Sequence, residues 1–303
     1  MKNIFYLFCA LILTCSAFAM ENAEHDKALQ EIKSTFGMVP TFFKEFPESG
    51  LAGAWEEFKN VQFSPTAPLS PKTRELIGLA VASQIPCRYC TFFHKQALRF
   101  DGATDKEMNM AIAVSATNRK WSSYFNGAQL DMASFKTEAD KIAASVQKNE
   151  GKAKKQILVT DLTSAKEDMQ NTLGFVPNFI NAYPEAALPG AWSEVKNILM
   201  SSDVLPAKDK NLMSLAVSSQ TPCSYCIYID TAMAKAEGAT PAEIQESIAM
   251  AGMVRHWSTV LNGLQQDEKA FQTEVNSMFK YLQKNKHQDN KKMGLRETEI
   301  EKE

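Results

Sequence analysis

An internal duplication constrains this sequence more than any other feature. Residues 35–40 (TFGMVP) recur as residues 172–177 (TLGFVP), and the segment Gly53-Ala54-Trp55 recurs at 190–192, each shifted by 137 positions. After a one-residue deletion the shift is 136, which pairs 79–81 with 215–217 and 119–122 with 255–258. Because these matches keep the same order and an almost constant shift, they indicate two copies of a single domain. We predict a first copy at residues 20–147, and a linker with the second copy at residues 148–283.

The local pattern within each copy predicts an all-α fold. Ser70 followed by Pro71 is typical of a helix start, because proline at the first helical position loses no hydrogen bond. Thr104 with Glu107, and Thr240 with Glu243, have the spacing of capping boxes. No segment alternates apolar and polar residues as a half-buried strand does. The four tryptophans that recur in the two copies are predicted to pack in the core: Trp55, Trp121, Trp192 and Trp257.

Residues 1–19 have the layout of a secretory signal peptide. Lys2 precedes an apolar run from residue 4 to residue 13, and the segment ends in Ala17-Phe18-Ala19. Such a pattern predicts cleavage after Ala19 and a secreted or periplasmic mature protein. Acylation at Cys15, as in a lipoprotein, is an alternative. No later run approaches the roughly 20 apolar residues of a membrane span.

Composition excludes some partners. The 303 residues carry a formal net charge of -2, so there is no broad basic field for a nucleic-acid backbone. The last segment, residues 284–303, mixes Lys with Glu and has few apolar side chains. We predict a charged tail there, either a frayed helix or a disordered end.

Cysteine positions point to the chemistry. Cys9 and Cys15 fall in the predicted signal, and the other four form the pairs Cys87/Cys90 and Cys223/Cys226, each directly after a proline. A Cys-x-x-Cys pair at a helix start places both sulfurs on one face, within reach of a disulfide. The amide groups and dipole of a helix N-terminus also stabilise a thiolate. Each pair is therefore a candidate redox centre.

Only the first pair has acid-base residues in the expected places. His94 lies four residues after Cys90, on the same helical face, and favours Cys90 over Cys87 as the nucleophile. Glu75, on the preceding predicted helix, could orient the imidazole. Because an unbroken helix would separate Glu75 from Cys87 by about 18 Å, their contact requires the chain to turn near Pro86.

These residues resemble the signature of the AhpD-like alkylhydroperoxidases, a branch of the carboxymuconolactone decarboxylase-like family. The resemblance implies two tandem AhpD-like helical domains and a peroxidase or thiol-disulfide oxidoreductase activity that uses no metal or other cofactor. It implies that Cys90 attacks the hydroperoxide, that Cys87 resolves it as disulfide partner, and that His94 and Glu75 relay the proton. It also implies homo-oligomers, here a trimer of two-domain chains. Tyr89 departs from the family, which often has histidine between the cysteines.

The second copy keeps Cys223 and Cys226 but not their partners. Asn211 stands where the first copy has Glu75, and Asp230 stands where it has His94. An anionic Asp230 one turn from Cys226 would disfavour a thiolate. We therefore expect a degenerate site that serves as a lasting disulfide or an electron relay.

The sequence thus predicts an exported thiol peroxidase that reduces hydroperoxides and is itself reduced by an external dithiol of unknown identity. One alternative is thiol-disulfide exchange with a protein partner. Another is a non-enzymatic helical binding module in which the cysteine pairs are disulfide staples, as oxidising compartments favour. A zinc site shared by the two pairs would need ligands from positions more than 130 residues apart.

Overall fold

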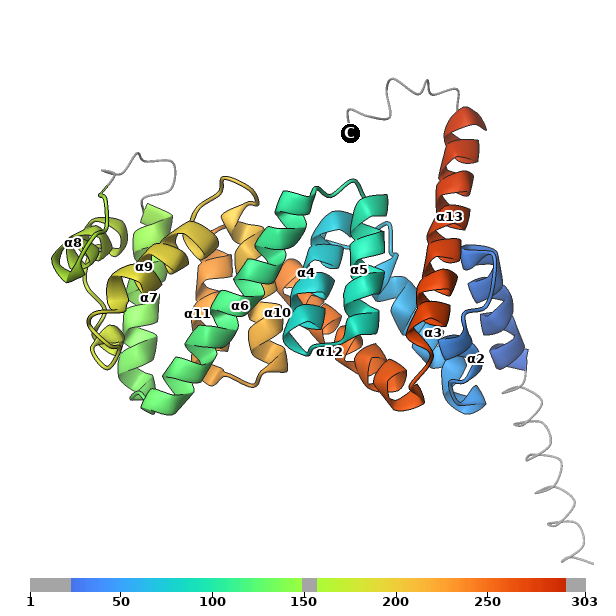
Figure 1. Cartoon of the computed structure of the whole chain (residues 1–303), viewed down its shortest axis with the longest axis horizontal. Coiled ribbons are helices and arrows are strands. Elements are labelled where there is room, and N and C mark those ends of the chain that lie inside the picture. The colour runs from blue at the N-terminus through green and yellow to red at the C-terminus, as the bar shows by residue number, and fades with distance from the viewer. Residues whose placement is uncertain (1–22, 149–156, 293–303) are drawn as a thin grey trace, which may run out of the picture. The chain divides into compact units, whose positions relative to one another are not determined.

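The computed structural model describes residues 23–148 and 157–292, and every regular element in these two ranges is helical (Figure 1). In the first copy a helix at residues 23–36 is followed by α2 (Thr41–Lys44), α3 (Glu48–Gln62), α4 (Pro71–Gln84), α5 (Arg88–Phe100), α6 (Asp105–Ala128) and α7 (Met132–Lys148). The second copy contains α8 (Leu162–Leu173), the 3-10 helix η1 (Asn178–Ile180), α9 (Leu188–Val195), the π-helix η2 (Lys196–Met200), α10 (Ala207–Gln220), α11 (Ser224–Ala236), α12 (Pro241–Leu264) and α13 (Glu268–Lys292). The all-α prediction is confirmed.

The helix starts have the predicted caps. The Ser70 hydroxyl accepts from the backbone N–H of Thr73 and begins α4 with Pro71 in its first turn. At α6 the Thr104 hydroxyl accepts from the Glu107 N–H, while the Glu107 carboxylate accepts from the Thr104 N–H. The same reciprocal bonds join Thr240 and Glu243 at α12. Local sequence therefore determines where these helices begin.

All four recurring tryptophans are buried, as predicted. The Trp55 indole N–H donates to a Glu31 carboxylate oxygen at 3.0 Å. Trp192, its counterpart in the second copy, donates to Asp168 at 2.8 Å. Each copy therefore pairs its buried indole N–H with a carboxylate from the helix that opens the copy, which avoids an unsatisfied donor in the core.

The chain forms two compact units that differ from the two sequence copies. One unit comprises residues 1–64 with 259–303, of which 23–64 and 259–292 are described, and the other comprises residues 65–258. Each unit therefore contains residues from both copies. The boundaries of the sequence copies themselves stay a prediction.

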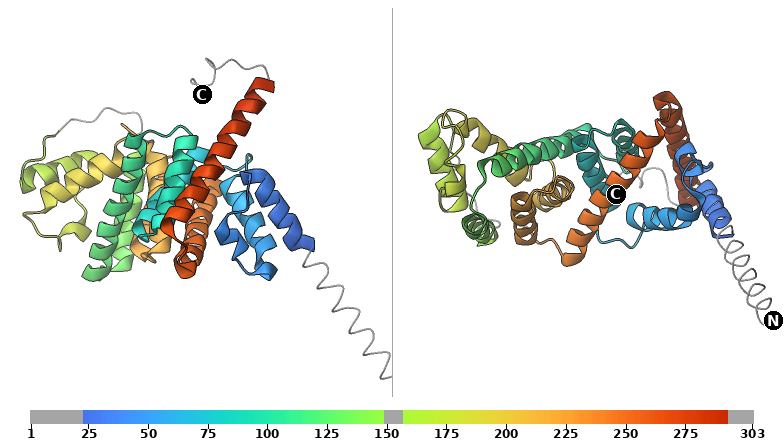
Figure 2. Two further views of the ribbon diagram at one scale, coloured as in Figure 1. Left: turned by 45° about the vertical axis from the view of Figure 1, so that its right-hand side comes forward. Right: turned by 90° about the horizontal axis from the view of Figure 1, so that it is seen from below.

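Within each unit, the last helix of one copy packs on the opening segment of the other. In the larger unit, Glu138 on α7 accepts from the backbone N–H of Asn178 at 2.9 Å. In the smaller unit, Glu274 on α13 accepts from the backbone N–H of Thr41 at 3.0 Å. Figures 1 and 2 show α13 beside the N-terminal helices of its unit. The two contacts occupy equivalent positions, so the copies have exchanged their C-terminal helices.

Some sequence predictions lie outside the described residues. The predicted signal at residues 1–19, Cys15 included, is one of them, as is nearly all of the polar linker. In the predicted charged tail, residues 284–292 continue α13, and residues 293–303 are outside. In the described ranges, no helix combines the length and apolar character that a bilayer span requires.

Candidate functional site

The first cysteine site, which we define as Cys87, Cys90, His94 and Glu75, is built where α4 turns into α5. Cys87 is the N-cap of α5, and its Sγ accepts from the backbone N–H of Cys90 at 3.1 Å. The two cysteines form a disulfide, with their Cα atoms 5.3 Å apart. Cys87 is fully buried and Cys90 is 4% exposed. The structure therefore holds the pair in its oxidised state at a helix N-terminus, where a thiolate would be stabilised after reduction.

The turn at Pro86 brings His94 against Glu75. His94 Nδ1 lies 2.7 Å from Glu75 Oε2, and both side chains are at least 95% buried. With Glu75 ionised, its oxygen accepts, so Nδ1 carries a proton and Nε2 is the ring nitrogen left to exchange one. His94 follows Cys90 by one helical turn on α5, so the imidazole and the cysteine share one face.

Gly78 is a part of this site that the sequence analysis missed. A Cβ atom built at Gly78 on α4 would lie 2.3–2.8 Å from three atoms of the His94 ring. The ring therefore occupies the space that any larger residue would need. The second copy has Ser214 at the equivalent position, opposite the smaller Asp230. The sequence signal for the role of Gly78 is this paired difference, glycine with histidine in one copy and serine with aspartate in the other.

The second cysteine site, Cys223 and Cys226 with Asn211 and Asp230, has the same backbone. Cys223 is the N-cap of α11, its Sγ accepts from the Cys226 N–H at 3.2 Å, and the two form a disulfide. Asp230 occupies the position of His94 but has different partners. Its Oδ2 accepts from the Ser218 hydroxyl and, at 2.8 Å, from the Asn118 amide.

Asn118 belongs to the first copy, so residues of both copies build the second cysteine site. Neither Asn118 nor Ser218 was predicted from the sequence. Their counterparts at the first site are Val254 and Ala82, which cannot donate a side-chain hydrogen bond. Two polar replacements at buried positions were a signal, but only the fold shows that both face one carboxyl group.

The electrostatics of Asp230 differ from the expected anion. Burial disfavours its charged form and raises the pKa of Asp230 to about 7, although the bonds from Ser218 and Asn118 act in the opposite direction. Near neutral pH the neutral form of Asp230 is therefore populated beside the anion. The expected repulsion of a Cys226 thiolate is correspondingly weaker.

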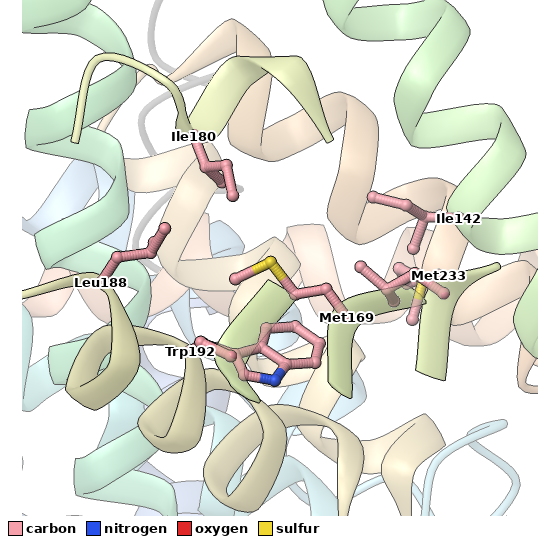
Figure 3. Close-up of a cluster of buried hydrophobic side chains, with 8 residues drawn as sticks. Ile142, Met169, Ile180, Leu188, Trp192 and Met233 are labelled. Atoms are coloured by element: carbon pink, nitrogen blue, oxygen red, sulfur yellow. The ribbon is translucent and has the colours of Figure 1, made fainter. Parts of the chain in front are cut away.

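A cavity of about 130 Å³ adjoins the second cysteine site. Cys226, Asp230, Asn211 and Asn118 contribute to its wall. The rest of the wall is largely apolar, and Figure 3 shows part of it, where side chains from different segments gather around Met169. This cavity was not predicted from the sequence.

Other candidates do not join either site. His256, which stands where the first copy has Lys120, is exposed and contacts the Trp257 ring edge-on. In residues 23–148 and 157–292, no group of three or more His, Cys, Asp and Glu side chains is arranged to hold a metal ion.

Comparison with known proteins gives one match. The model of the carboxymuconolactone decarboxylase family matches residues 50–130 and 186–268. The first region contains Glu75, Cys87, Cys90 and His94, and the second contains their counterparts. No curated protein and no solved structure matches the chain.

Replacing Gly78 with alanine is expected to displace the His94 ring and to destabilise the fold by about 1–3 kcal/mol, as overpacking does. Gly53→Ala is the matched control, since a Cβ atom on that helical glycine meets nothing within 4 Å. The control should be neutral or up to about 1 kcal/mol more stable. Urea denaturation measures both variants, and equal stabilities would contradict the packing argument.

Asp230→Asn is expected to flatten the pH dependence of stability. The pKa of Asp230 is about 7 in the fold and 3.8 without it, so the folded state binds more protons between these values and unfolding becomes easier as pH rises. From pH 5 to pH 8 the wild type should lose roughly 2–3 kcal/mol relative to the variant. An asparagine oxygen can still accept from Ser218 and Asn118. Denaturation at both pH values, with disulfides intact, tests this, and a constant difference would refute it.

Proposed function

The chain belongs to the carboxymuconolactone decarboxylase family, and we propose that it is a thiol peroxidase with one active site, the first cysteine site. The observation that carries this proposal is the buried 2.7 Å contact between His94 and Glu75, on the helix that begins at the redox pair. A structural disulfide needs no such pair, and burying two ionisable side chains is costly unless they serve each other.

In the proposed reaction the reduced site begins with a Cys90 thiolate, whose proton has passed to His94. The thiolate attacks one oxygen of the hydroperoxide, so that an S–O bond forms and the O–O bond breaks. The alkoxide leaves with the proton from His94 as an alcohol, and Cys90 becomes a sulfenic acid. The Cys87 thiolate then attacks the Cys90 sulfur, which forms the disulfide and releases hydroxide that is protonated to water. An external dithiol reduces the disulfide to close the cycle.

Burial of the sulfurs favours a small substrate over a protein disulfide. Cys87 is fully buried and Cys90 is 4% exposed, so a hydroperoxide reaches them more easily than the sulfur of a folded partner. For the same reason Cys90 is the sulfur that a reductant meets first. The proposed chemistry takes its electrons from the dithiol and uses no metal or other cofactor.

The second cysteine site is not part of the proposed reaction. Asn211 cannot relay a proton as Glu75 can, and Asp230 is engaged with Ser218 and Asn118. Cys223 and Cys226 therefore act as a lasting disulfide in this proposal. That disulfide lies in the same compact unit as the active site, residues 65–258.

The proposal includes export and assembly. The pattern of residues 1–19 supports a protein secreted or delivered to the periplasm, whose mature chain begins at Met20. Two family domains in each chain are consistent with a trimer of chains. N-terminal sequencing of the exported protein and sedimentation test the two points. A retained leader would contradict export, and a stable monomer would contradict the trimer.

Cys90→Ser is expected to reduce hydroperoxide turnover to background, because it removes the attacking sulfur. His94→Asn should lower kcat/KM by about 100-fold or more, within the range of lost general acid-base catalysis. Cys223→Ser, at the position equivalent to Cys87, should keep wild-type turnover. Steady-state assays with cumene hydroperoxide and dithiothreitol measure all three. Full activity in Cys90→Ser would refute the proposed function.

A further inference from the structure

The cavity beside the second cysteine site lies where this copy has smaller side chains than the first. At four equivalent positions, paired by the shift of 137, phenylalanine in the first copy is replaced by a smaller aliphatic residue in the second. The pairs are Phe36 and Leu173, Phe43 and Ile180, Phe58 and Val195, and Phe63 and Met200. In the first copy these rings pack on one another, with centroids 5.4–5.7 Å apart for Phe36–Phe63, Phe43–Phe58 and Phe58–Phe63.

All four replacements line the cavity. Leu173, Ile180, Val195 and Met200 contribute to its wall, and Figure 3 shows Ile180 with the neighbouring apolar residues. A folded core seldom keeps a void of this size, because each lost contact weakens it. Smaller side chains at four positions together leave room for a small molecule.

The backbone also changes at the cavity. The first copy has one regular helix, α3, over residues 48–62. Its counterpart passes from α9 into the π-helix η2 after Val195, and Leu199 and Met200 of η2 line the cavity. π-Helical turns are rare in proteins, and those that do occur are often found at functional sites. The widened turn is therefore a second, independent difference between the copies at the same place.

Two hydrogen-bond donors in the cavity wall indicate where the polar group of a bound molecule would lie. Asn211 Nδ2 and Trp121 Nε1 are buried, and neither has a hydrogen-bond partner in the described part of the chain. Leaving such donors unpaired is costly, so an acceptor on a bound molecule would stabilise both. Among the described residues that line the cavity none is Lys, Arg or His, so the wall offers no cationic side chain to hold a carboxylate.

From these observations we propose that the second copy is a binding site for a small, neutral carbonyl compound with an apolar body. The carbonyl oxygen accepts from Asn211 Nδ2, and the body fills the space that the four phenylalanines occupy in the first copy. The volume of about 130 Å³ suits a body near the size of a six-membered ring, since a dry cavity of about 150 Å³ accepts benzene. The inference is independent of the peroxidase proposal, because it concerns the copy that lacks Glu75 and His94.

The test uses two probes of nearly equal shape, cyclohexanone and methylenecyclohexane, which differ in having or lacking a carbonyl oxygen. The full mature chain with both disulfides is labelled at its methionine methyl groups and titrated in an NMR spectrometer. Three cavity residues, Met169, Met200 and Met233, report binding directly. We expect saturable shifts of these three signals, with cyclohexanone bound about threefold to tenfold more tightly, as one neutral hydrogen bond allows.

Variants separate the two parts of the proposal. Val195→Phe restores the residue that the first copy has at this position, Phe58, and should abolish the shifts with both probes. Asn211→Leu removes the donor with little change in volume, and should bring the two affinities within about twofold of each other. Asn109→Leu, at an exposed position of α6, is the matched control and should leave both affinities unchanged.

Three results would overturn the proposal. They are an absence of saturable shifts in the wild type, equal affinities for the two probes, and unchanged binding by a Val195→Phe protein that keeps the far-UV circular dichroism of the wild type. Peroxide turnover is measured separately in the Cys90 variants, so the two proposals can fail independently.

Discussion

The first cysteine site depends on one interaction, the buried hydrogen bond between Glu75 and His94. Either side chain alone would be costly to bury, because a charged group loses its hydration and gains nothing in an apolar interior. Together they satisfy each other at 2.7 Å, and this contact joins α4 to α5 beside the disulfide. It also explains Gly78, because the imidazole can lie against α4 only where that helix has no side chain. Three features that are separate in the sequence are thus one structural requirement.

The second copy stabilises its buried ionisable side chain in a different way. Without His94 and Glu75, a carboxyl group at Asp230 is stabilised by neutral donors from Ser218 and Asn118, and its pKa rises to about 7 because no cation replaces the lost hydration. The duplication kept the capping boxes at Thr104 and Thr240 and the N-cap cysteines, whereas Pro206 of α10 lacks the side-chain cap that Ser70 gives α4. The side chains around the cysteine sulfurs differ between the two copies. One copy has the groups needed for proton transfer, and the other has a cavity.

How well the sequence predicts a structural feature depends on how far apart in the chain the residues that determine it lie. The helix starts at Ser70, Thr104 and Thr240 were predictable because their hydrogen bonds span three residues. The contact of Glu75 with His94 was foreseeable because a short turn at Pro86 joins their helices. Asn118 was not, since it reaches Asp230 across 112 positions through packing of one copy on the other. The cavity could not be predicted because it depends on the combined volume of several side chains that only the fold brings together.

The exchange of C-terminal helices makes the fold of the first copy depend on the second. The opening segment of the first copy is covered by α13 of the second, where Glu274 accepts from Thr41 and Phe271 packs 6.1 Å from Phe42. If the second copy were deleted, these groups would lose their partners and an apolar surface would be exposed to water. The packing of the first copy therefore depends on the backbone of the second, whatever the cysteines of the second copy do. Nothing in this packing requires proton-relay residues around Cys226, so the side chains there can differ from those of the first cysteine site while the shared fold is kept.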